Sequence, residues 1–166
     1  MTLLQIAGGQ TWPNFLPLLG YRPDQAIFFT SADPESAYAK SIESMKQAAN
    51  ALPDPQQIHT SIISTVGTEP TLQECRTTLQ QVNPANISLI NLTGGTKVMS
   101  LAAFLFAQEH RIPSFQLDTR RKLHPFDDCD TAPQPKAFPS KSTSKPPSNV
   151  RDFLFLPPSN TPWKHI

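Results

Sequence analysis

The sequence predicts an α/β domain with a Rossmann-like, doubly wound and mostly parallel sheet, followed by a Pro/Ser/Lys-rich C-terminal extension. Short apolar runs alternate with segments of helical periodicity, which is the order expected of parallel strands joined by helical crossovers. The runs contain few polar residues, as expected of strands that are covered on both faces. Composition changes near residue 130, so we expect a domain at residues 1–130 and an extension at residues 131–166.

Five apolar runs are the expected strands, at residues 3–7, 26–30, 58–66, 87–92 and 114–118. Glycine, proline or small polar residues follow each run and mark its end. The third run is rich in β-branched residues, which favour strands. Residues 119–124 are expected to extend the fifth strand through a turn.

Four helices are expected between these strands, at residues 12–19, 35–51, 71–82 and 98–110. The first has a proline in it or near its start. Before the second, a polar stretch leads into Pro34, an arrangement typical of a helix start. Proline-containing turns are expected to end the second and third helices.

The extension differs from the domain in proline content and in charge. Eight of the 18 prolines lie in residues 132–166, and the net charge of this segment is positive, whereas the preceding residues are net negative. Residues 133–149 are expected to be a flexible linker. Residues 151–158 are more apolar, and three arrangements are open: docking on the domain, adding an edge strand, or crossing to a partner chain.

Charge and composition exclude several classes of protein. A formal net charge of +1 argues against binding to duplex nucleic acid or to a membrane. No run approaches the roughly 18 apolar residues of a membrane helix, and the N-terminus lacks the features of a signal peptide. The two cysteines and four histidines show no ligand spacing, so we expect no metal and no cofactor. These features predict a cytoplasmic protein.

The candidate binding site is the stretch 91–100, in which Gly-Gly-Thr-Lys at 94–97 joins an expected strand to an expected helix. Backbone N–H groups at a glycine turn that opens a helix bind anions, and a lysine adds a full charge. The spacing is not that of a P-loop. The loop 8–11 does not have the dinucleotide-binding fingerprint either. A ligand bearing phosphate is therefore predicted, and a purely structural turn is the alternative.

The loops that follow the expected strands should converge at one edge of the sheet, where ligands bind in this class of fold. These loops are 8–11, 30–33, 66–69, 93–97 and 118–120. His124, beside the basic run 120–122, is a candidate catalytic acid or base, and a solvated histidine is the alternative.

The motif Asn-Leu-Thr-Gly-Gly-Thr-Lys-Val-Met at 91–99 resembles the signature of the CRISPR-associated Rossmann-fold (CARF) domain family. The branch that it resembles most is that of the Can and Card effectors. Gly-Gly-Gln at 8–10, Pro-Asn at 13–14 and Leu-Asp-Thr at 117–119 are similar to that branch too. The resemblance covers roughly residues 1–125.

The resemblance implies a homodimer that binds one cyclic oligoadenylate, expected to be cyclic tetra-adenylate, across its two-fold axis. It implies that residues 94–97 cradle a phosphate, that the loop 8–11 lines the ring, and that Thr30 and Ser31 contact a ribose or an adenine. The ligand-binding residues implied in this way are Gly8, Gly9, Gln10, Thr11, Thr30, Ser31, Thr93, Gly94, Gly95, Thr96, Lys97 and Asp118.

The family's effectors carry a nuclease domain, and we expect none after residue 125 because too few residues follow. The resemblance therefore implies a metal-independent ring nuclease that switches off type III CRISPR antiviral signalling. In such an enzyme a ribose 2′-hydroxyl attacks the adjacent phosphodiester. The catalytic candidates are Lys97, Thr96, Gln10 and Thr11. The alternatives are a binding-only CARF module, a truncated effector, or an unrelated α/β domain that binds a phosphate ligand.

Overall fold

The computed structural model describes residues 1–8, 12–31, 41–45, 47, 58–65, 67, 69–118, 123–125 and 133. These residues form one six-stranded sheet in the order β3-β2-β1-β4-β5-β6. The strands are β1 Thr2–Ile6, β2 Gln25–Thr30, β3 His59–Ser64, β4 Leu89–Asn91, β5 Ser114–Leu117 and β6 Leu123–Pro125. The first five are parallel, and β6 is antiparallel to β5. The predicted fold class is confirmed.

The helices occupy the expected places with shifted ends. They are α1 Trp12–Tyr21, α3 Leu72–Leu79 and α4 Lys97–His110. Residues 41–45 and 47 are also helical and belong to the helix expected at 35–51, the rest of which lies outside the described residues. Thr71 caps α3 in a reciprocal capping box with Glu74. Strand β4 is shorter than expected, and a 3₁₀ turn, Pro84–Asn86, precedes it in the chain.

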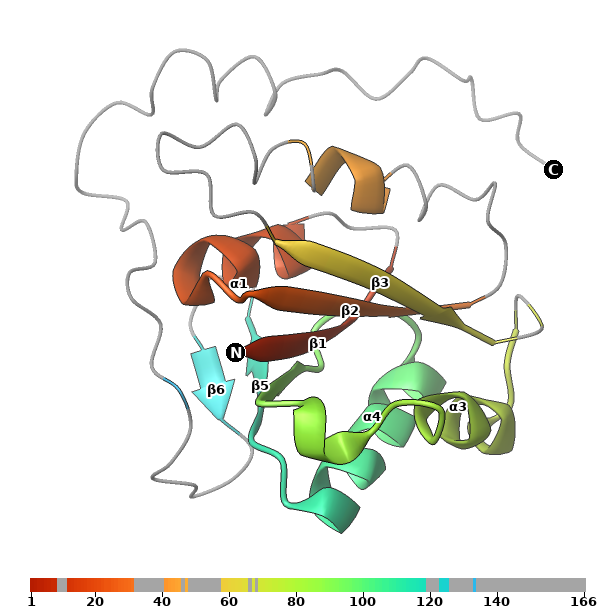
Figure 1. Cartoon of the computed structure of the whole chain (residues 1–166). Helices are drawn as coiled ribbons and strands as arrows, with labels where there is room; N and C mark the ends of the chain where they lie inside the picture. The colour runs from red at the N-terminus through yellow and green to blue at the C-terminus, as the bar shows by residue number, and fades with distance from the viewer. Residues whose placement is uncertain are drawn as a thin grey trace, which may run out of the picture.

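Helices cover both faces of the sheet, as a doubly wound fold requires (Figure 1). Alternate residues of each buried strand point to opposite faces. On one face, Leu4, Ile6 and Ile90 pack with residues of α3 and α4. On the other, Leu3, Phe28 and Phe115 pack with α1 and with Ile42 and Met45.

The strand order reverses between β1 and β4, which are neighbours in the sheet. From this point the chain continues outward in opposite directions, through β2 on one side and β5 on the other. Such a switch point opens a crevice at the carboxyl ends of the two strands. The loop that begins at Gly8 and the turn at 94–97 both leave the sheet there.

Several expectations fall outside the described residues. Only Pro133 of the extension is described, so the domain boundary and the docking of residues 151–158 stay predictions. Within the part of the chain that the structure describes, no helix is long and apolar enough to cross a membrane.

Candidate functional site

The glycine turn at 94–95 lies directly on the end of strand β1. A Cβ at Gly94 would overlap the carbonyl oxygen of Ile6, and a Cβ at Gly95 would overlap the Ile6 side chain. Gly95 also has a φ of 70°, which few residues with a side chain adopt. A Cβ at Gly8 would lie 2.6 Å from the backbone nitrogen of Gly95. All three glycines therefore allow two neighbouring strand ends to approach closely.

Asn91, the last residue of β4, is fully buried beneath this turn. Its Nδ2 lies 2.8 Å from the carbonyl oxygen of Pro13, 3.1 Å from Gln5 Oε1 and 3.4 Å from Asn14 Oδ1. Its Oδ1 accepts hydrogen bonds from the backbone N–H and the hydroxyl of Thr93, at 3.1 and 2.6 Å. One side chain thus connects β1, α1 and the start of the turn.

The hydroxyl of Thr93, which the sequence assigned to the ligand, takes part in two internal hydrogen bonds. It donates to Asn91 Oδ1 and accepts the backbone N–H of Leu117 at 2.8 Å. Thr93 therefore ties the turn to β5, and it also lines the pocket described below.

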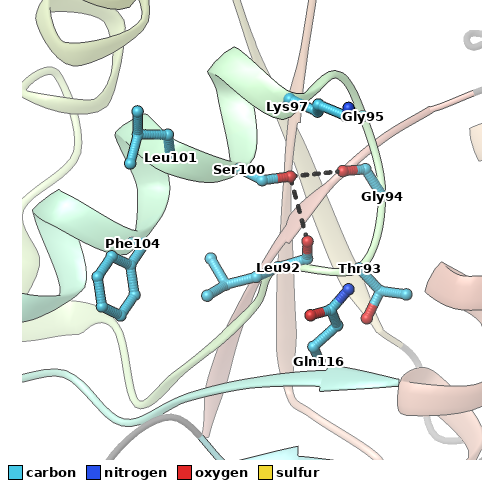
Figure 2. Close-up of a pocket in the computed structure, with 9 residues that line it drawn as sticks. All are labelled: Leu92, Thr93, Gly94, Gly95, Lys97, Ser100, Leu101, Phe104 and Gln116. Carbon is cyan, nitrogen blue, oxygen red and sulfur yellow. Dashed lines mark hydrogen bonds between the residues drawn. The ribbon is translucent and has the colours of Figure 1, made fainter. Parts of the chain in front are cut away.

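Ser100 holds the turn from the other side. Its Oγ lies 3.2 Å from the carbonyl oxygen of Leu92 and 3.1 Å from that of Gly94, as Figure 2 shows. Both carbonyl groups belong to the turn, so this hydroxyl fixes the turn to the first helical turn of α4.

Helix α4 begins at Lys97, and Thr96 is its N-cap. The Thr96 hydroxyl accepts the backbone N–H of Met99 at 3.3 Å. The first N–H groups of an α-helix have no partner within the helix, and the N-terminus carries a partial positive charge. Thr96 and Lys97 are both exposed. This end of α4 therefore offers hydrogen-bond donors and an ammonium group to an anion.

An open pocket of about 400 Å³ adjoins the turn. Leu101 and Phe104 line it from α4, and Gln116 extends toward it from β5 (Figure 2). The remaining lining residues are Leu92, Thr93, Gly94, Gly95, Lys97 and Ser100. Because apolar side chains lie beside a cationic end, the pocket suits a ligand with a flat apolar group and a nearby anion.

The other predicted site residues that the structure describes lie at the same edge of the sheet but differ in accessibility. Thr30 and Ser31 end β2 and are only 8% and 6% exposed. The Thr30 hydroxyl donates to the carbonyl oxygen of Ser31 at 3.2 Å. Asp118 follows β5, and its Oδ2 lies 3.3 Å from Nε2 of His124. Gly9, Gln10 and Thr11 lie outside the described residues.

The structure thus brings together Gly8, the turn 93–97 and, along β5, Asp118. Sequence reasoning missed the pocket walls formed by Leu101, Phe104 and Gln116. A signal for the walls exists, because Gln116 is polar between two apolar strand residues, and Leu101 and Phe104 lie four and seven positions after Lys97. Among the described residues, no cluster of three His, Cys, Asp or Glu side chains is arranged to hold a metal.

A family model described as the Card1 CARF domain matches residues 2–124. No curated protein matches the chain. Among solved structures, Can2 from Sulfobacillus thermosulfidooxidans, in complex with cyclic tetra-adenylate, is 22% identical with a TM-score of 0.56, over 75% of this chain and 34% of its own.

Two further structures share the fold. VC1899 from Vibrio cholerae is 13% identical with a TM-score of 0.60, over 75% of this chain and 33% of its own. Csm6 from Enterococcus italicus, bound to cyclic hexa-2'-fluoro-hexa-dAMP, is 14% identical with a TM-score of 0.56, over 74% of this chain and 34% of its own. At these identities the similarity shows the fold alone, and the chain spans about a third of the length of these three proteins.

Proposed function

The chain belongs to the Card1 CARF domain family, and from this membership we propose that it binds a cyclic oligoadenylate, most specifically cyclic tetra-adenylate, in type III CRISPR signalling. The observation that carries the proposal is the glycine turn at the switch point, which opens α4 and presents Lys97 beside a partly apolar pocket. This arrangement matches the two chemical parts of a nucleotide.

In this proposal a phosphate lies over residues 94–97. The N-terminal N–H groups of α4 donate hydrogen bonds to it, and Lys97 supplies a full positive charge. An adenine occupies the pocket, against Leu101 and Phe104, and the amide of Gln116 is within the same wall. Gly8, Gly9, Gln10, Thr11, Thr30, Ser31, Thr93 and Asp118 are assigned to the neighbouring ligand contacts.

The active species in this proposal is a homodimer. A pocket of about 400 Å³ has the size of a site for one small molecule, whereas a ring of four nucleotides is much larger. A second copy would double the site, and a two-fold symmetric ring would meet two identical halves. Val98 and Leu101 support this, because they are 37% and 49% exposed on α4 next to the pocket. Exposed apolar side chains of this kind are typical of interfaces.

The proposed reaction is metal-independent cleavage of the ring. The 2′-oxygen of one ribose bonds to the adjacent phosphorus while the bond from phosphorus to the 5′-oxygen breaks, which leaves a 2′,3′-cyclic phosphate and a 5′-hydroxyl. Lys97 and the N–H groups near Thr96 stabilise the negative charge that develops on phosphorus, and Gln10 and Thr11 align the ribose. This reaction would remove the signal that CRISPR effectors respond to.

The test is to incubate the purified chain with cyclic tetra-adenylate in EDTA and to separate the products by chromatography. Ring opening to linear products that end in a cyclic phosphate is expected. Intact ligand after prolonged incubation, together with tight binding by calorimetry, would instead establish a binding module without turnover.

A further inference from the structure

Asp118 and His124 lie close to each other beside β5, the strand that contributes Gln116 to the pocket. Asp118 follows β5, and His124 is the middle residue of β6. The Oδ2 atom of Asp118 lies 3.3 Å from Nε2 of His124. The histidine side chain is 57% exposed and that of the aspartate 32% exposed. The pair is therefore held in the protein and remains accessible to a ligand.

The sheet register puts this pair on the same face as the pocket. His124 is the register partner of Gln116, which lines the pocket. Side chains of partnered residues on neighbouring strands point to the same face, and so do residues two apart on one strand. Asp118 is two residues beyond Gln116, whereas Leu117 between them packs in the core on the α1 side. Gln116, Asp118 and His124 thus form one polar row opposite α4.

We propose that His124 is the general base of ring cleavage and that Asp118 is its positioning residue, an inference that rests on the proposed function. With Nε2–H donating to Asp118, the other ring nitrogen, Nδ1, is the proton acceptor. As the 2′-oxygen bonds to phosphorus, its proton passes to Nδ1. The bond between phosphorus and the 5′-oxygen breaks, and the 5′-oxygen takes a proton from water. The imidazolium then returns its proton to the hydroxide that remains.

The location of the other described histidines favours His124. His59 is the first residue of β3 and therefore lies at the amino edge of the sheet. His110 is the last residue of α4, a helix that begins at the carboxyl edge and runs away from it. Of the histidines in the part of the chain that the structure describes, His124 alone lies at the edge where the pocket opens.

The experiment compares wild type with His124→Ala, His124→Gln and Asp118→Asn, and uses His59→Gln as the matched control. Dissociation constants for cyclic tetra-adenylate are measured by calorimetry, and single-turnover cleavage is followed at saturating protein in EDTA. For His124→Ala we expect a cleavage rate lower by about 100-fold or more, because a general base contributes about 10²–10⁴-fold. Its dissociation constant should stay within about threefold of the wild-type value, because a residue that acts only in the chemical step contributes little to ligand binding.

Added imidazole should restore part of the rate to His124→Ala, which a purely structural role would not allow. Asp118→Asn should lower the cleavage rate less than His124→Ala does, and His59→Gln should behave as wild type. If the wild-type chain cleaves the ring and His124→Ala cleaves it at the same rate, the proposed role of the pair is wrong. The ring-nuclease proposal would still stand. Loss of binding in both His124 variants also overturns it. An intact ring with the wild-type chain overturns both proposals.

Discussion

Replacing Lys97 by alanine tests the phosphate site most directly. Two opposite unit charges about 4 Å apart attract each other by about 1 kcal/mol in water and about 4 kcal/mol at an effective dielectric constant of 20. Lys97 is exposed at the first turn of α4, so the lower part of this range applies. A loss of about 1–2 kcal/mol corresponds to a dissociation constant that is higher by about 5–30-fold.

The matched control is Arg76→Ala, which removes the same charge. Arg76 pairs with Glu109 near the far end of α4. Glu109 is twelve positions after Lys97, which puts this site about 18 Å away along the helix. Titration calorimetry with cyclic tetra-adenylate at two salt concentrations should show weaker binding and weaker salt dependence for Lys97→Ala, with little change for Arg76→Ala or Lys97→Arg. Equal affinities for Lys97→Ala and wild type would refute the phosphate site.

Three further predictions address stability and assembly. Gly94→Ala should lower the free energy of unfolding by about 1–3 kcal/mol in urea titrations, because its Cβ would overlap the Ile6 carbonyl oxygen; an unchanged midpoint would contradict this packing. Hydrogen bonds from the Thr71 backbone N–H and hydroxyl lower the pKa of Glu74 below 4.5. The stability that Glu74 adds should therefore be complete above pH 4.5 and lost as pH falls through its folded pKa. The free energies of unfolding of wild type and Glu74→Gln should converge in acid. Leu101→Glu should shift a dimer to monomer in light scattering. Ile62→Glu should not, although the Ile62 side chain on β3 is about as exposed as that of Leu101.

The sequence was sufficient for the parallel sheet because each buried strand is a short apolar run between turn residues. It located the glycine turn for the same reason: a strand end, two glycines and a helix start follow one another within ten residues. The antiparallel pairing of β6 was not evident, since three residues with one histidine carry little periodicity.

The pocket walls depend on contacts between segments far apart in the chain. Gln116 faces Phe104 and Leu101 only because β5 lies beside β4 and α4 packs back across the sheet. The commitment of Thr93 to Leu117 likewise depends on the sheet, because the two residues are 24 positions apart. Local patterns identify residues able to bind a phosphate, whereas burial, as at Thr30 and Ser31, needs the folded chain.

The hydrogen bonds of Asn91 have a mechanical consequence. Its amide is joined to Pro13 at the start of α1, to Gln5 in β1, and through Thr93 to Leu117 in β5. The Thr93 hydroxyl makes both the 2.6 Å bond to Asn91 and the 2.8 Å bond to Leu117, so a displacement of Thr93 disturbs both. Hydrogen bonds therefore link the turn to α1, which packs on one face of the sheet, and to β5 within the sheet.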